Sequence, residues 1–130
     1  MIVVDTNVIA YLCLPGSEYA EAAQDLFDED PDWSVPVLWR SEFRNLLAGY
    51  LRRMTLTFET ACAIQSAAED LLNGAEFEVS SDDVLRLVRD SKCSAYDCEF
   101  VALALQLDTE LVTGDRQILR AYPGVAIPLY

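Results

Sequence analysis

Two acidic residues of this chain stand where a predicted strand gives way to a predicted helix, a position at which carboxylates can do chemistry. Asp5 follows an apolar, β-branched run at residues 2–4, which is typical of a strand buried in a parallel sheet, and it precedes an apolar stretch at residues 8–12. Such a carboxylate lies at the carboxyl edge of the sheet, where open α/β folds place their sites. Capping of the following helix is the alternative interpretation. Asp115 repeats the arrangement at the end of a second predicted strand, at residues 110–113.

Two further acids occur on predicted helices. Asp97 falls in the first turn of an apolar, small-residue helix, where the helix dipole favours a negative charge. Glu42 lies four residues from both Leu38 and Leu46, so it interrupts an apolar stripe on a long helix predicted over residues 37–54. An ion pair with Arg40 or Arg44 is a structural explanation for a partly buried glutamate, although neither has the favoured i+4 spacing. The structural and functional interpretations of Glu42 therefore both remain open.

A convergence of these acids would select a particular chemistry. Two carboxylates ~5 Å apart repel each other by roughly 3 kcal/mol at an effective dielectric constant of ~20, so four together require protons or a cation. Oxygen ligands without histidine or cysteine select a hard ion such as Mg²⁺ or Mn²⁺. An ion of this kind activates water and stabilises the charge that develops on a phosphoryl group. The residues thus favour metal-assisted phosphodiester hydrolysis.

The composition excludes several other classes of protein. The chain contains no histidine, which removes Ser-His-Asp and Cys-His mechanisms, and its 130 residues predict one domain spanning residues 1–130. An apolar content of 52% excludes a disordered chain, and no apolar run approaches the ~20 residues of a membrane span. The four cysteines have no C-x-x-C spacing, so we expect free thiols in a reduced, cytoplasmic protein.

The formal net charge of −13 limits the choice of partners. It argues against tight, nonspecific binding of nucleic acid, because such binding depends on lysines and arginines that neutralise phosphates. A basic partner, a bound cation or solubility alone are each compatible with it.

The elements that would position the acids alternate along the chain. The sequence predicts strands at residues 2–4, 33–36, 77–79, 110–113 and 126–129, separated by helical stretches. This order is typical of a three-layer α/β/α fold, in which helices flank a central, mostly parallel sheet. If the first strand and the strand before Asp115 are neighbours, Asp5 and Asp115 emerge at the same edge. Connectivity alone does not require Asp97 to reach that edge.

Four motifs in order along the chain carry a family resemblance. They are residues 2–9 (IVVDTNVI), Ser41-Glu42, residues 94–97 (SAYD) with 102–104 (ALA), and residues 111–119 (LVTGDRQIL). With these motifs the chain resembles a PIN domain, in particular the small VapC-type toxins. A receiver domain fits less well, because it needs a lysine after a late strand and the only lysine, Lys92, follows a helix. A haloacid-dehalogenase-like phosphatase needs an Asp-x-Asp motif, and position 7 is Asn rather than Asp.

The resemblance implies an activity and roles for individual residues. It implies a Mg²⁺- or Mn²⁺-dependent endoribonuclease, the toxin of a type II toxin-antitoxin system, whose metal ligands and catalytic acids are Asp5, Glu42, Asp97 and Asp115. Thr113 would position water or metal by hydrogen bonding, and Asn7 would hold Asp5 in place. It also implies a homodimer and a basic antitoxin that wraps the protein. The alternative from another class is a PIN-like scaffold that does not cut and acts by binding a partner protein.

Contacts to an RNA substrate would require basic side chains near the acids. The candidates on or beside the Glu42 helix are Arg40, Arg44, Arg52 and Arg53, each of which is otherwise explained as a solvated surface charge. Because the acids provide no covalent nucleophile, we expect water to attack and leave a 5′-phosphate and a 3′-hydroxyl. The acidic surface favours a few folded RNAs that present an accessible single-stranded loop.

Overall fold

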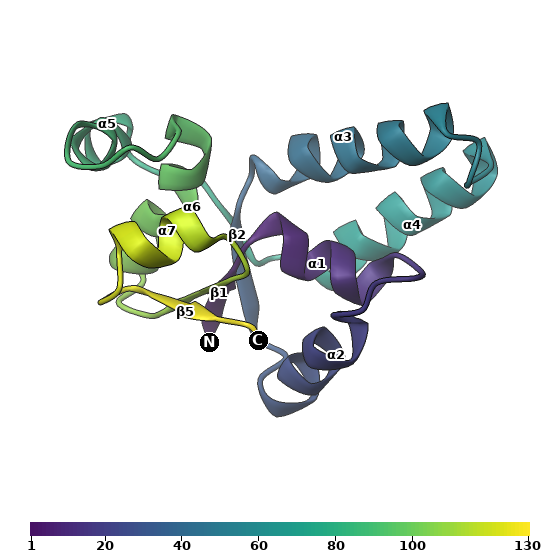
Figure 1. The fold of residues 1–130 in the computed structure, drawn as a ribbon, viewed down its shortest axis with the longest axis horizontal. Helices are drawn as coiled ribbons and strands as arrows, with labels where there is room; N and C mark the ends of the chain where they lie inside the picture. Colours follow the sequence, from purple (N-terminus) through teal and green to yellow (C-terminus); the bar gives the residue numbers. More distant parts are fainter.

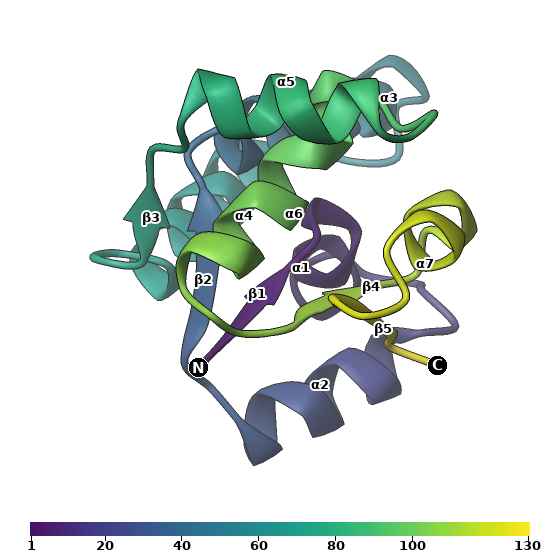
Figure 2. The same cartoon turned by 90° about the vertical axis from the view of Figure 1, so that its left-hand side faces the viewer.

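Five short parallel strands form the centre of the molecule in this computed structural model of residues 1–130 (Figure 2). The strands are β1 (Ile2–Val4), β2 (Trp33–Pro36), β3 (Glu76–Phe77), β4 (Leu111–Thr113) and β5 (Ala126–Pro128), in the spatial order β3-β2-β1-β4-β5. In the register of the two central strands Val3 is opposite Leu111 and Val4 is opposite Val112. Strands β1 and β4 are therefore neighbours, as the convergence of Asp5 and Asp115 required.

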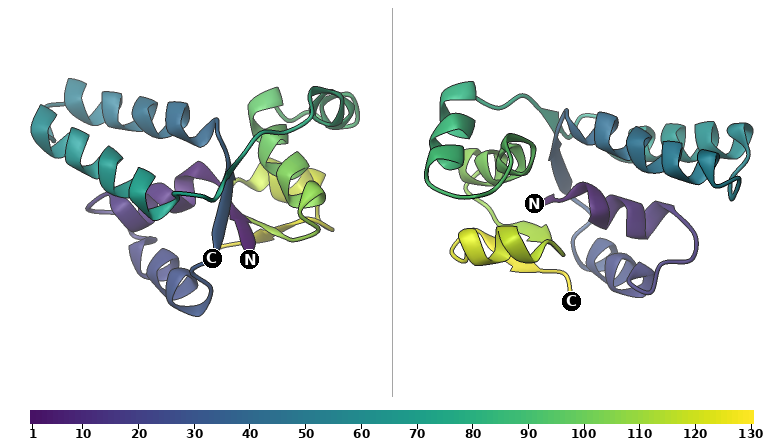
Figure 3. Two further views of the ribbon diagram at one scale, coloured as in Figure 1. Left: turned by 180° about the vertical axis from the view of Figure 1, so that it is seen from behind. Right: turned by 45° about the horizontal axis from the view of Figure 1, so that its top comes forward.

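Seven helices cover the two faces of the sheet and complete a three-layer α/β/α fold. They are α1 (Thr6–Cys13), α2 (Ala20–Glu29), α3 (Trp39–Arg52), α4 (Phe58–Leu71), α5 (Ser81–Arg89), α6 (Ala95–Gln106) and α7 (Arg116–Ala121). Helices α1 to α4 lie on one side of the sheet and α5 to α7 on the other (Figures 1 and 3). The predicted fold class is thus confirmed, and the sheet is parallel throughout.

The core explains why these elements form. Val3 and Val4 are fully buried between the two helical layers, as the apolar run of β1 predicts for a strand covered on both faces. Six residues of α6 are buried, which fits its sequence of small and apolar side chains. In α3 the buried stripe consists of Trp39, Phe43 and Leu47, at four-residue spacing. Glu42 is next to this stripe, at the boundary between core and solvent.

Several element ends differ from the predicted ones for local reasons. Helix α3 ends at Arg52 rather than Met54, because Met54 has a positive φ of 59° that does not continue a right-handed helix. Strand β3 is two residues long and begins at Glu76, one residue before the predicted strand. The predicted helix stops at Gly16 and Gly74 are confirmed, and both glycines have positive φ. None of the helices combines the length and the apolar character that a membrane span needs.

Candidate active site

The four predicted acids line one cleft at the carboxyl end of β1 and β4. The cleft has a volume of about 420 Å³ and is formed by the first turns of α1, α3, α6 and α7. Its lining residues are Asp5, Thr6, Asn7, Leu38, Ser41, Glu42, Asn45, Leu46, Tyr96, Asp97 and Asp115. Asp97 therefore does reach the edge where Asp5 and Asp115 emerge. Asn7 is also part of the lining.

Asp5 is the most buried acid of the cleft and is held by two hydrogen bonds. The backbone N–H of Thr6 donates to its Oδ1 at 2.7 Å and the hydroxyl of Thr113 donates to its Oδ2 at 2.7 Å. The pKa of Asp5 is raised to about 6, mainly by burial and to a smaller extent by the charges of Glu42 and Asp97, while its two hydrogen bonds oppose the increase. Asp5 thus caps α1, as the structural interpretation predicted, and is also a desolvated acid within an acidic cleft.

Thr113 connects two of the acids from the end of β4. It is fully buried, and while its hydroxyl donates to Asp5, its Oγ1 accepts a hydrogen bond of 3.0 Å from the backbone N–H of Asp115. The two strand ends are thereby fixed to each other through one side chain.

Glu42 is held by a hydroxyl rather than by an arginine. The Oγ1 of the buried Thr6 donates to Glu42 Oε1 at 2.7 Å. Arg40 pairs instead with Glu69 and Glu76, so the explanation of Glu42 by an ion pair with Arg40 is wrong. Burial raises the pKa of Glu42 above its ordinary value, and the charge of Asp97 adds to the increase.

The last two acids lie at the beginnings of α6 and α7. Ser94 caps α6, and its Oγ accepts a hydrogen bond of 3.1 Å from the backbone N–H of Asp97. Burial raises the pKa of the Asp97 carboxyl, and the neighbouring charge of Asp115 raises it as well. Asp115 caps α7, since its Oδ1 accepts hydrogen bonds from the backbone N–H groups of Gln117 and Ile118.

The oxygen atoms that line the cleft are of the type that a hard divalent cation binds. No lysine or arginine lines the cleft, so the carboxylates are not neutralised by a basic side chain there, and oxygen ligands are those that Mg²⁺ and Mn²⁺ prefer. The acids are not arranged as a group of three or more that could hold an ion. Both oxygens of Asp5 and one oxygen of Asp115 accept hydrogen bonds from the protein. Joint binding of an ion by these acids therefore requires some of their side chains to move closer together.

The four candidate arginines have different surroundings. Three nitrogens of Arg40 donate to Glu69 and Glu76 over 2.6–2.8 Å. Arg44 is exposed and donates to the hydroxyl of Ser41 at 3.2 Å, on the lining of the cleft. Arg53 lies over the ring of Tyr50, 4.8 Å from its centroid. Arg52 is also exposed.

Four cleft residues received no role from the sequence: Thr6, Ser41, Asn45 and Tyr96. Asn45 follows Glu42 by three residues and so lies on the same helix face. This spacing could have identified Asn45 from the sequence. Thr6 is of a residue type that often caps helices, and no other feature of the sequence distinguishes it. Its bond to Glu42 joins residues 36 positions apart and depends on the packing of α1 against α3.

Comparisons with known proteins identify the family of the chain. The PIN domain family model matches residues 2–123 of the chain. No curated protein matches the chain in sequence.

Several solved structures share the fold at low sequence identity. FitAcB from Neisseria gonorrhoeae has a TM-score of 0.77 at 18% identity, with 99% of this chain and 98% of that chain covered. A toxin–antitoxin complex from Klebsiella pneumoniae has a TM-score of 0.72 at 16% identity over 100% and 98% of the two chains. A protein from Pyrobaculum aerophilum has a TM-score of 0.74 at 22% identity over 98% and 90%. With a family model that spans almost its whole length, the chain belongs to the PIN domain family.

Proposed function

We propose that this protein is a divalent-metal-dependent endoribonuclease and the toxin of a VapC-type toxin-antitoxin pair. PIN domains are generally nucleases. The observation that carries the proposal for this chain is the single cleft that contains Asp5, Glu42, Asp97 and Asp115 and no basic side chain. Such a concentration of negative charge costs free energy in the folded protein, which a function in binding a cation explains.

The residues of the cleft have distinct roles in this proposal. Asp5, Glu42, Asp97 and Asp115 would hold Mg²⁺ or Mn²⁺, which supplies activation of water and stabilisation of phosphoryl charge when bound. Thr113 orients Asp5 and Thr6 orients Glu42 through the hydrogen bonds described above. Asn7, at the start of α1, lines the cleft and would hold Asp5 in place.

The protein is acidic, so binding of an RNA substrate would depend on the few basic side chains near the cleft that can contact its phosphates. Arg44 is hydrogen-bonded to a lining residue and is the first candidate for a phosphate contact. Arg52 and Arg53 lie at the far end of α3 and are further candidates. Arg40 is a weaker one, because its donors already bind two glutamates.

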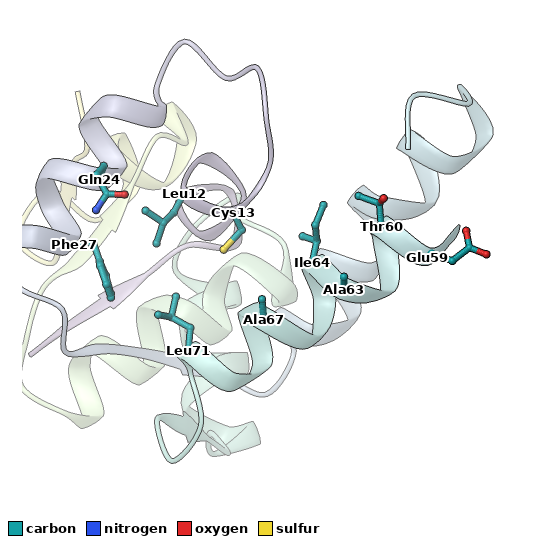
Figure 4. Close-up of a pocket in the computed structure, with 10 residues that line it drawn as sticks. All are labelled: Leu12, Cys13, Gln24, Phe27, Glu59, Thr60, Ala63, Ile64, Ala67 and Leu71. Atoms are coloured by element: carbon teal, nitrogen blue, oxygen red, sulfur yellow. The ribbon is translucent and has the colours of Figure 1, made fainter. Parts of the chain in front are cut away.

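A basic antitoxin is the partner that this proposal requires. An apolar groove of about 640 Å³ lies between α1, α2 and α4, lined among others by Leu12, Phe27, Ile64 and Leu71 (Figure 4). It suits the apolar face of an antitoxin helix, whose basic residues would be attracted by the net charge of −13. One structural neighbour is a toxin–antitoxin complex. Homodimerisation and a cytoplasmic location are parts of the same proposal.

Hydrolysis of RNA by the purified protein tests the proposal. We expect protein freed of any partner to cleave structured RNA in millimolar Mn²⁺ and to leave 5′-phosphate and 3′-hydroxyl ends. Asp115→Asn should abolish cleavage while preserving the cap of α7, because asparagine is also a good N-cap. Asp25→Asn, an exposed acid on α2, is the matched control and should cleave normally. Products with 2′,3′-cyclic phosphates, or cleavage that survives chelation, would overturn the mechanism.

A partner-binding scaffold without nuclease activity is the second candidate function. The observation that favours it is that the acids are not arranged as a ligand group and that Asp5 and Asp115 bind protein donors. A scaffold should capture a basic protein from native extract and show no hydrolysis with Mg²⁺ or Mn²⁺. Asp115→Asn would then leave that capture unchanged.

A further inference from the structure

The acidic cleft continues into a second hollow that is lined by tyrosines. This hollow has a volume of about 440 Å³ and lies between α1, the segment of residues 14–19 and α3. It shares Asn7 and Leu46 with the acidic cleft, so the two are contiguous. Helices α1 and α3 run side by side from the carboxyl edge of the sheet (Figures 1 and 3). We call this hollow the tyrosine pocket and define it by Tyr11, Tyr19 and Tyr50.

The tyrosine pocket is part of an aromatic cluster that reaches the acidic cleft. The rings of Tyr11 and Tyr19 are 5.2 Å apart, and Tyr130 stacks on Tyr19 with a centroid distance of 3.8 Å and an interplanar angle of 4°. Tyr130 also lies against Gly114, where an added Cβ would be 2.8 Å from the Tyr130 hydroxyl oxygen. The aromatic cluster thus contacts Gly114, the residue before Asp115.

The polar groups of the pocket suit a flat, neutral ligand with hydrogen-bonding edges. Burial, together with Tyr130, Tyr19 and Asp5, raises the pKa of Tyr11 to about 12, so its hydroxyl remains protonated at neutral pH. Glu18 supplies an exposed acceptor on the lining. The guanidinium of Arg53 over the Tyr50 ring places a cation beside the pocket. The volume lies within the ~300–1,000 Å³ range of small-ligand sites.

We propose that the tyrosine pocket binds one unpaired nucleobase of single-stranded RNA whose neighbouring phosphodiester lies in the acidic cleft. This inference rests on the proposed nuclease function and adds a substrate requirement to it. A protein with a charge of −13 repels phosphates, whereas a nucleobase is neutral and stacks on aromatic rings. Base stacking provides affinity that does not depend on neutralising the backbone. It also selects RNA loops over duplexes, whose bases are already stacked and paired.

Binding can be measured without cleavage, so the test separates this inference from the nuclease proposal. A short RNA hairpin carries 2-aminopurine at one loop position, and wild-type protein is titrated into it in the presence of chelator. We expect the fluorescence to be quenched when the base stacks in the pocket. Scanning the label through the loop should give one position with strong quenching, and a label in the stem should give none.

Variants of the pocket identify the stacking residue. Tyr50→Leu keeps apolar volume but removes the aromatic face, and it should weaken binding by about 5- to 150-fold, the equivalent of one lost stacked base. Tyr50→Phe should restore it. Phe58→Leu is the matched control, because Phe58 is an exposed aromatic residue at the start of α4, outside the pocket. An abasic nucleotide at the quenched position should weaken binding to wild type but add little to the effect of Tyr50→Leu.

The outcomes distinguish the two proposals. Quenching that is lost in Tyr50→Leu supports the base site even if Mn²⁺ induces no cleavage, a result that would overturn only the nuclease function. Cleavage with Mn²⁺ but no quenching at any loop position, or equal binding by Tyr50→Leu and Phe58→Leu, overturns the base site. Loss of a co-purifying basic protein in Tyr50→Leu, with RNA binding unchanged, assigns the pocket to a protein partner and overturns it as well.

Discussion

At the scale of single residues, Asp5 shows how the fold sustains an unfavourable group at the cleft. The residue is 7% exposed and lies near two other acids, yet the bonds from Thr6 and Thr113 fix both oxygens of its carboxylate. An increase of its pKa from 3.8 to about 6 corresponds to about 3 kcal/mol of destabilisation when it is ionised at neutral pH. The pKa values of Glu42 and Asp97 are raised as well, so the cleft as a whole opposes folding when no cation is bound.

The metal-free protein should therefore become more stable as the pH falls from about 7 towards 5. A group whose pKa is higher in the folded state takes up its proton in the folded state first, so acidification through a pKa of about 6 favours folding. We expect Asp5→Asn to flatten this dependence and to raise the free energy of unfolding at pH 7.5 by on the order of 1–3 kcal/mol. Urea denaturation in chelator, followed by Trp fluorescence, measures both.

An exposed acid provides the comparison for this prediction. Asp25→Asn, on the solvent side of α2, should leave the pH dependence between 7 and 5 as in wild type. A wild-type stability that decreases over this range would contradict the assignment of Asp5 as a desolvated acid.

At the scale of elements, the first turns of the helices orient the acids. Ser94 caps α6 through a hydrogen bond from the backbone N–H of Asp97. Ser94→Ala should lower the free energy of unfolding by about 1 kcal/mol, because an N-cap bond is lost. Cleavage should fall less than in Asp97→Asn, since the carboxylate itself remains. Ser94→Thr, which keeps a capping hydroxyl, should behave as wild type in both measurements.

The first turn of α3 is fixed by a second set of contacts. Arg40 binds Glu69 of α4 and Glu76 of β3, and Glu76 also accepts a 2.8 Å hydrogen bond from the indole N–H of Trp39. The bonds from Arg40 hold the pKa of Glu76 below its ordinary value. Since Glu42 belongs to the same turn of α3, these contacts also help to position this acid of the cleft.

Replacing Arg40 should destabilise the protein in a pH-dependent way. Arg40→Ala should lower the Tm at pH 7, where Glu76 is ionised. The difference from wild type should shrink as the pH falls below 4.5, because protonation of Glu76 removes the interaction. Arg52→Ala, on the exposed end of α3, is the control and should leave the Tm unchanged. A pH-independent loss in Arg40→Ala would indicate lost packing rather than a lost ion pair.

At the scale of the whole molecule, a cation bound in the acidic cleft, as proposed above, would raise the stability of the folded protein. A ligand that binds only the folded state stabilises it by about 2.7 kcal/mol at a concentration of 100 times Kd. We expect millimolar Mn²⁺ to raise the Tm of wild type and to have little effect on Asp5→Asn or Asp97→Asn. The difference in Tm with and without Mn²⁺ is the quantity to compare, because the substitutions themselves relieve repulsion. Equal shifts in all three proteins would place the binding outside the acidic cleft.

The same charge predicts the behaviour of a partner. A small basic protein should co-purify from the native source and dissociate at high salt, because salt screens attraction between exposed charges. Glu42→Ala should weaken the association if a basic side chain enters the cleft. Recovery of no basic protein from native extract would argue strongly against an antitoxin.

The order of the elements could be predicted from the sequence, and so could a shared edge for Asp5 and Asp115 on the condition that β1 and β4 are neighbours, which the structure shows. Both follow from local signals: short β-branched runs, a capping acid after each, and the rule that parallel strands end at one edge. The end of α3 differed from the prediction because of one backbone angle, the positive φ of Met54. The start of β3 differed because Glu76 pairs with Val35 of β2.

The side chains that surround the acids could not be predicted, because they come together only through tertiary packing. The bond from Thr6 to Glu42 spans 36 residues, the bond from Thr113 to Asp5 spans 108, and the stacked pair of Tyr19 and Tyr130 also joins distant parts of the chain. Periodicity and propensity describe neighbours along the chain, so they contain no information about such contacts. The bond from Thr6 to Glu42 forms because α1 and α3 lie on one face of the sheet with their first turns together at its carboxyl edge, and the bond from Thr113 to Asp5 forms because β1 and β4 are neighbouring strands.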